Sequence, residues 1–373
     1  MRVSPNTSRK NTRSLQEMSG SGMTGGPVFQ LSEYLISKKS FLQWTDSLME
    51  GFTIIGPAWD GRQTVFREVG SSAELTLNYV TTMLAPGKLH IYRPKEKLFR
   101  FSLSGRQEIG ELPAFNGKQI IVGVHPCDTN AILYLDRTFL GEFKDPFYEA
   151  RRNNTIIISL NCTDVAPDCF CRSMGTGPFL NADSGFDMLL TDFGDDFLVE
   201  VKTERVNRLF NVSGARRAGN EEFALKAAKE KSALLKFTKT IDIAGLDSLL
   251  RDNPEHPVWG QTSDERCLSC SNCVMVCPTC FCYDVVDEIS MDMKTAVRHR
   301  QLDACQDRKF AEVHGGNFRA RRAARLRQFV THKLDHTRQY GVFGTVGCGR
   351  CITWCPTGID LTEIAKEIQR TKR

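Results

Sequence analysis

The sequence has 373 residues, enough for two or three domains with hydrophobic cores of their own. Its 41% hydrophobic and 25% charged residues are ordinary for a soluble globular protein. The 49 basic and 44 acidic residues leave a net charge of +5, which is too small to indicate a nucleic-acid or membrane-surface partner. No run approaches the roughly 18 apolar residues of a membrane span, so we expect none.

Residues 1–27 form a polar and basic leader that has no acidic residue before Glu17. It lacks the apolar stretch of a secretory signal, so we expect a cytoplasmic protein. A transit peptide, a disordered tail and an over-long start with Met23 as the true one are the alternatives. We favour a disordered leader.

Residues 28–215 read as an α/β domain. A helix candidate with Asp128 as its N-cap stands between two apolar runs, which predicts a strand–helix–strand unit with parallel, neighbouring strands. In chain order, the runs that suit strands are Phe52–Ile55, Thr64–Val69, Leu98–Phe101, Gln119–Val124, Thr155–Leu160 and Phe197–Val201.

Residues 216–258 are expected to be a helical connector. Asn220 is expected to cap a helix whose apolar face carries Phe223, Ala227, Leu234 and Leu235. From 259 to 373 the chain is cysteine-rich, with helical patterns at Phe318–Tyr340 and Leu361–Gln369. The predicted fold is thus an α/β N-terminal domain followed by a mainly α-helical, cysteine-rich domain.

Fourteen cysteines are many for such a chain, and they fall into two groups. Ten lie between Cys267 and Cys355, and four lie between Cys127 and Cys171. Without an export signal a disulfide scaffold is not expected, and dense cysteine in an intracellular protein indicates metal binding.

The first cysteine motif has gaps of two, two and three residues and then a proline, which is the pattern of bacterial ferredoxins that bind two 4Fe-4S clusters. It consists of Cys267, Cys270, Cys273, Cys277 and Pro278. Three cysteines two residues apart wrap the backbone around one cluster, while the fourth points away to a second cluster. Zinc sites also use Cys-x2-Cys pairs, but four cysteines in eleven residues exceed what one zinc site needs, so we favour iron–sulfur.

The second motif consists of Cys348, Cys351, Cys355 and Pro356. The first cluster would then be held by Cys267, Cys270, Cys273 and Cys355. The second cluster would be held by Cys277, Cys348 and Cys351, which is one ligand short because Thr345 stands where a full motif has cysteine. Either the second site is a 3Fe-4S cluster, or Cys305, Cys280 or Cys282 completes it; we favour Cys305.

The four cysteines of the first domain follow strand candidates. Cys127 comes just after the run Gln119–Val124, and Cys162 comes just after Thr155–Leu160. The carboxyl ends of parallel neighbouring strands meet at one edge of a sheet, and Cys169 and Cys171 follow within one loop. We expect a third cluster here; buried structural cysteines and a catalytic thiolate at Cys127 are the alternatives.

The segment Phe318–Tyr340 carries seven basic residues against Asp335 alone. Read by itself, the segment suits a protein helix that binds nucleic acid. A redox-sensing regulator that binds DNA is therefore a hypothesis from a different functional class. Positive charge near an anionic cluster tunes its potential, so we favour cluster support and partner docking, with no nucleic acid.

The chain resembles a known family, the iron–sulfur beta subunit of cytoplasmic NiFe hydrogenases of the sulfhydrogenase type. It also resembles, as a related family, the iron–sulfur subunit of anaerobic sulfite reductase. The matching stretches cover roughly residues 50–370 and include GVHPCD at 123–128, CFCRSMGTGP at 169–178, CPTCFCYDVVDE at 277–288, LDACQ at 302–306 and VGCGRCITWCP at 346–356. Thr345 is the departure, since relatives carry cysteine at this position.

The resemblance implies a subunit that does no bond-making chemistry and links a flavin-containing, NAD(P)H-binding subunit to a hydrogenase catalytic module. It also implies an additional cluster on the cysteines of GVHPCD, SLNC and CFC. The chain itself has no glycine-rich loop behind a strand that would cradle a dinucleotide phosphate. We therefore predict a non-catalytic electron-relay subunit; the alternative is an electron-transfer subunit of an anaerobic sulfite or sulfur reductase.

Overall fold

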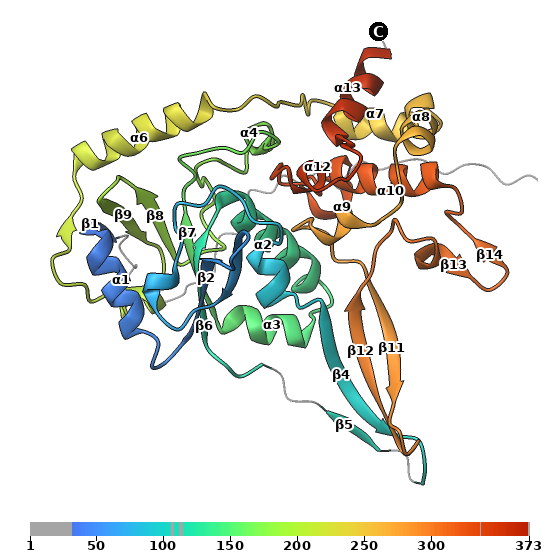
Figure 1. Cartoon of the computed structure of the whole chain (residues 1–373), viewed down its shortest axis with the longest axis horizontal. Coiled ribbons are helices and arrows are strands. Elements are labelled where there is room, and N and C mark those ends of the chain that lie inside the picture. Colours follow the sequence, from blue (N-terminus) through green and yellow to red (C-terminus); the bar gives the residue numbers. More distant parts are fainter. Residues whose placement is uncertain (1–31, 106–107, 112–114, 336, 372–373) are drawn as a thin grey trace, which may run out of the picture. The chain divides into compact units, whose positions relative to one another are not determined.

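A computed structural model of the chain describes residues 32–105, 108–111, 115–335 and 337–371 (Figure 1). The predicted leader, residues 1–27, lies outside the described residues. Within the described part of the chain, no helix combines the length and the apolar character that crossing a membrane requires.

The larger sheet has eight strands in the order β10-β1-β9-β8-β7-β6-β2-β3. Its centre, β2-β6-β7-β8, is parallel, and the remaining neighbours are antiparallel. Five of the six predicted strands belong to this sheet. Its strands are β1 (Ser32–Ser37), β2 (Thr53–Trp59), β3 (Thr64–Glu68), β6 (Gln119–Val124), β7 (Thr155–Leu160), β8 (Met188–Asp192), β9 (Asp196–Val201) and β10 (Arg216–Arg217).

The predicted strand–helix–strand unit is confirmed as β6, α2 (Pro126–Phe139) and β7, with the two strands parallel and adjacent. All residues of β6 and β7 are buried, as expected of central parallel strands. The predicted N-cap was wrong, because the helix is capped by His125 and begins at Pro126. Proline suits the first helical position, since it has no N–H to leave unpaired.

Shorter helices connect the strands of the first half of the chain. The long helix α6 (Asn220–Leu234) begins at the residue predicted to cap it, and its N-cap is Gly219. Of the expected apolar face, Phe223 and Leu234 are half-buried and Ala227 and Leu235 are exposed, so this face packs only in part against the rest of the chain. The other helical elements are α1 (Lys38–Ser47), η1 (Ser72–Glu74), η2 (Gly87–Ile91), α3 (Pro146–Asn153), α4 (Cys171–Met174) and α5 (Glu204–Asn207).

The smaller sheet joins strands from both halves of the chain. Its order is β11-β12-β4-β5, all antiparallel, and Figure 1 shows β4 beside β12. The strands are β4 (Lys95–Ser102), β5 (Ile109–Glu111), β11 (Tyr283–Ile289) and β12 (Thr295–Leu302); a hairpin of β13 (Glu312–Val313) and β14 (Gly316–Asn317) follows. The expectation of a mainly α-helical second domain is not confirmed, because it overlooked these strands.

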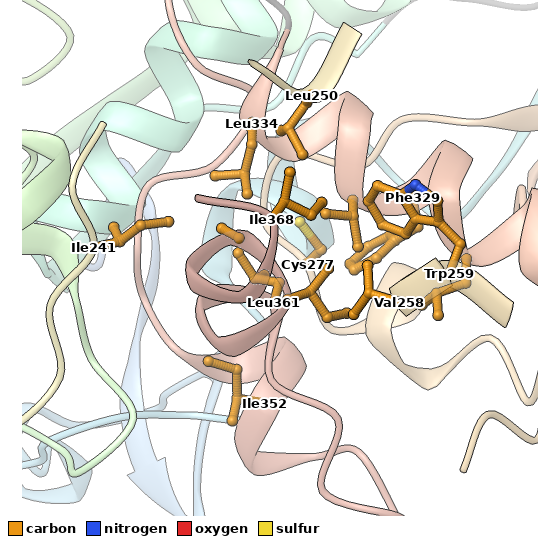
Figure 2. Packing of buried hydrophobic residues seen from close by; sticks show 14 of the residues in the cluster. Ile241, Leu250, Val258, Trp259, Cys277, Phe329, Leu334, Ile352, Leu361 and Ile368 are labelled. Atoms are coloured by element: carbon orange, nitrogen blue, oxygen red, sulfur yellow. The ribbon is translucent and has the colours of Figure 1, made fainter. Parts of the chain in front are cut away.

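The helices of the C-terminal part surround a hydrophobic core. Figure 2 shows Cys277 within it, near Trp259 and Leu361. The core also includes Phe170 from the first half of the chain, and residues 31–373 form one compact unit. The helices are α7 (Leu246–Asp252), α8 (Pro257–Glu265), α9 (Asn272–Met275), η3 (Lys309–Ala311), α10 (Arg322–Leu334), α11 (Thr337–Tyr340), α12 (Arg350–Thr353) and α13 (Leu361–Thr371).

Candidate iron–sulfur site

The first group of cysteines lines one cavity of about 40 Å³. Its members are the four predicted ligands of the first cluster, namely Cys267, Cys270, Cys273 and Cys355. Ser269 and Ser271, which separate these cysteines, have φ angles of 53° and 67°. These left-handed residues fold the backbone tightly, and the Ser269 N–H donates to the Cys267 sulfur at 3.4 Å. The chain therefore curls around this cavity as the motif predicts.

A second group forms around Cys277, which is 5% exposed. The thiol of Cys280 donates a hydrogen bond to Cys277, which lowers the pKa of Cys277. Cys351 is half-buried, lies near the thiols of Cys277 and Cys348, and also lines the cavity of the first group. The predicted trio of Cys277, Cys348 and Cys351 is thus brought together, with Cys280 against its first member.

Thr345 and Cys305 have other neighbours. The Thr345 hydroxyl accepts from the Gly347 N–H at 3.2 Å, so it supports the loop of the second motif. The Cys305 thiol donates to Cys282 and lowers the pKa of Cys282 to about 7. Cys305 also faces Cys273 of the first group.

The third group joins the four cysteines of the α/β part. Cys127, Cys162, Cys169 and Cys171 line a cavity of about 20 Å³ together with Cys348. Cys127 lies in the first turn of α2, after β6, and Cys162 follows β7, so the sheet brings them to one edge as predicted. Burial raises the pKa of Cys169 to about 11, and it raises the pKa of the other three thiols as well.

Cys348 belongs spatially to two groups. It lines the cavity of the third group, and it also faces Cys277. The sulfur of Cys169 lies 3.6 Å from the Cys348 carbonyl oxygen. Cys351 of the same motif lines the cavity of the first group, so the second motif reaches both cavities.

Two glycines of the second motif permit this close approach. A Cβ on Gly347 would lie 2.6 Å from the Cys171 backbone nitrogen, and one on Gly349 would lie 2.5 Å from the Asp168 carbonyl oxygen. Both glycines have positive φ angles, 64° and 74°, which residues with a side chain rarely adopt. The Phe170 N–H donates to the Gly347 carbonyl at 2.8 Å and fixes the contact.

A buried ion pair fixes the same junction. The Arg350 guanidinium donates two hydrogen bonds to Asp128, at 2.6 and 2.8 Å, and a third to the Thr82 carbonyl at 2.7 Å. The two charged side chains are 3% and 1% exposed. Asp128, expected to cap α2, therefore anchors the second cysteine motif.

The basic segment predicted to support a cluster forms part of α10 and its approach. Arg322 donates to the Cys267 carbonyl at 3.0 Å, and Arg325 donates to the Ser269 hydroxyl at 3.2 Å. Two buried lysines, Lys88 and Lys333, lie beside the second group. Lys333 is one of the seven basic residues of the segment predicted to support a cluster, whereas Lys88 was not singled out from the sequence. As a lone lysine in an apolar context, Lys88 gives no pattern by which it could have been found.

The donor set fits iron–sulfur clusters better than a single ion. Among the described residues, no three His, Cys, Asp or Glu side chains converge closely enough to hold one metal ion. The thiolates around a four-iron cube stand farther apart than the ligands of one ion, and all of these donors are cysteine, the ligand that such clusters require. Two buried lysines that have no carboxylate partner among the residues described here, Lys88 and Lys333, also fit an anionic group.

Comparison with known proteins gives two matches. The model of a 4Fe-4S dicluster domain matches residues 266–359. Sulfhydrogenase 2 subunit beta of Pyrococcus furiosus is 34% identical over 340 residues, which are 88% of this chain and 96% of that protein. The chain belongs to the sulfhydrogenase beta-subunit family. No solved structure matches.

Family membership confirms the resemblance that the cysteine motifs indicated. The chain is an iron–sulfur electron-transfer protein with 4Fe-4S clusters in its dicluster region. The three cysteine groups thus belong to a protein of the sulfhydrogenase beta-subunit family.

Proposed function

We propose that this chain relays electrons within a multisubunit hydrogenase, between a NiFe catalytic module and a flavin-containing, NAD(P)H-binding subunit. The observation that carries the proposal is the placement of the second cysteine motif, in which Cys351 lines the cavity of the first group and Cys348 lines the cavity of the third. When bound, each cluster would take up and release one electron. The chain supplies thiolates and shielding from water and makes no bonds itself.

We assign one cluster to each of the three cysteine groups. The first is held by Cys267, Cys270, Cys273 and Cys355, which line one cavity. The third is held by Cys127, Cys162, Cys169 and Cys171, which line another. The second is held by Cys277, Cys348 and Cys351 with one further donor.

For the missing donor, the contacts favour a different cysteine from the one that the sequence favours. Cys280 lies directly against Cys277, whereas Cys305 contacts Cys282 and faces the first group. We therefore propose that Cys280 is the fourth ligand of the second cluster, in place of the cysteine that a full motif has at position 345. The alternatives are ligation by Cys305 and a 3Fe-4S cluster that needs no fourth ligand.

The first group is the end of the relay that reaches the surface. Cys270 is exposed, and the neighbouring Leu268 is 62% exposed. A partner that covers Leu268 would bring its own redox group close to the first cluster. The basic residues of α10 that bind this loop, Arg322 and Arg325, hold it in place for docking.

Metal and sulfide analysis tests the proposal. Anaerobically purified protein should contain about twelve irons and twelve sulfides per chain for three cubanes, or about eleven irons if the second cluster has three. About eight irons would remove the third cluster, and zinc without sulfide would overturn the proposal. Affinity purification from the native cytoplasm should also recover a flavoprotein and a nickel-containing subunit; recovery of a sirohaem protein instead would redirect it to sulfite reduction.

A further inference from the structure

Two lysines are buried beside the second cysteine group. Lys88, in η2, is 2% exposed, and Lys333, in α10, is 3% exposed. They come from opposite halves of the chain, yet both lie beside Cys277. Lys88 Nζ donates to the Cys277 carbonyl, and Thr279 Oγ1, which accepts from Lys333, lies 3.2 Å from the Cys277 sulfur. The structure therefore gathers two positive charges and the Cys277 thiol into one enclosed region.

Neutral oxygens bind both ammonium groups. Lys88 Nζ donates to the carbonyls of Val274 and Cys277, at 2.7 and 2.9 Å. Lys333 Nζ donates to the Thr279 hydroxyl at 3.0 Å and to the Gly344 carbonyl at 2.9 Å. Within the described ranges of the chain, neither lysine forms an ion pair with a carboxylate, although the buried Arg350, Arg151 and Arg300 all do.

Such an arrangement is costly unless an anion is present. Moving a charge out of water costs several kcal/mol, and hydrogen bonds to neutral oxygens do not cancel the charge. The groups able to carry the balancing negative charge here are the thiols of Cys277, Cys280 and Cys282. A thiolate-ligated cluster at Cys277 is an anion, so it would supply the missing balance.

We propose that Lys88 and Lys333 set the reduction potential of the second cluster, by favouring the more negative, reduced state through their charge. This rests on the proposed function, since it requires a cluster held by Cys277. Reduction adds one electron and no proton to the cluster, and two fixed positive charges in a region of low dielectric stabilise that added charge. The lysines are tuning residues; they do not ligate the iron.

The test compares neutral and charged replacements of each lysine. Lys88→Gln and Lys333→Gln remove the charge but keep a hydrogen-bond donor, whereas Lys88→Arg and Lys333→Arg keep the charge. Lys294→Gln, in the exposed turn between β11 and β12, is the matched control. Iron and sulfide are counted on each full-length protein, and cluster midpoint potentials are measured by redox titration followed by electron paramagnetic resonance.

Each glutamine variant should shift the reduction equilibrium of one cluster at least tenfold toward the oxidised state, which is 59 mV for a one-electron couple. The other clusters, both arginine variants and Lys294→Gln should stay near the wild-type values. Loss of about four irons in a glutamine variant but not in the matching arginine variant would also support the proposal, because the charge would then be needed to hold the cluster.

Unchanged potentials in both glutamine variants at full iron content would overturn the inference. Equal shifts, or equal iron loss, in the glutamine and arginine variants would overturn it too, since packing rather than charge would then be responsible. Wild-type protein without iron and sulfide would instead overturn the proposed function, so the two failures are distinguishable.

Discussion

The ion pair between Arg350 and Asp128 gives the sharpest test of how the second cysteine motif is attached to the α/β part. Asp128→Ala removes the carboxylate and leaves a guanidinium that the Thr82 carbonyl still holds in place. The side chains of the pair are 3% and 1% exposed, so Arg350 cannot regain water without separating the two segments. Breaking a buried pair in this way costs about 3–5 kcal/mol, and we expect a loss of that size in unfolding free energy.

Urea unfolding, followed by tryptophan fluorescence and by loss of cluster absorbance, measures this loss. The matched control is Asp287→Ala, which breaks the bidentate pair with Arg298 at 2.7 Å on the exposed face of the smaller sheet. Solvent screens that pair, so its loss should be far smaller. The double variant Asp128→Leu, Arg350→Met should recover most of the stability, because it leaves no unpaired charge.

A loss for Asp128→Ala no larger than the loss for Asp287→Ala would refute this reasoning. It would mean that water reaches Arg350 and that the junction between the second motif and α2 is open.

Three further predictions concern the same architecture. Cys280→Ser should lower the iron content by at least one per chain and Cys305→Ser should leave it unchanged, as measured by metal analysis; the reverse result would restore Cys305 as the ligand. Gly347→Ala should reduce the iron content by about four per chain, because the added Cβ would displace the loop of the third group. The control is Gly315→Ala, which also has a positive φ but whose Cβ meets open space, and it should keep the full iron content. Glu96→Gln should lower the unfolding free energy by about 3–5 kcal/mol in urea titrations, since Glu96 accepts from both Arg151 and Arg300 in a buried network; a loss below about 1 kcal/mol would show that these arginines are solvated.

The sequence predicted those features that depend on short-range pattern. Buried apolar runs such as Gln119–Val124 and Thr155–Leu160 form strands at the predicted residues, because central parallel strands are uniformly apolar. The cysteine spacing from Cys267 to Cys277 indicated the dicluster region, which the family match confirms. Both signals are local and need no knowledge of the tertiary structure.

Some contacts between distant segments could not be predicted. The pattern of β12 carries no information that its partner is β4, so the smaller sheet was missed. Tyr283–Ile289 contains Tyr, two Val and Ile, which favour a strand, but its polar and apolar residues do not alternate, so the pattern does not predict one. Gly347 is one of 29 glycines, and nothing local shows that the backbone of Cys171 approaches it.

The pairing of β4 with β12 also has a consequence for synthesis of the chain. The two strands are separated by roughly 190 residues, which a ribosome takes about 10–40 s to add at 5–20 residues per second. Throughout that interval β4 has an open edge able to pair with the wrong strand. Assembly of the first two cysteine groups must also wait, because each needs ligands from the second motif, which ends at Cys355. The nascent chain therefore needs protection of β4, and iron and sulfide can complete the first two groups only after Cys355 has emerged.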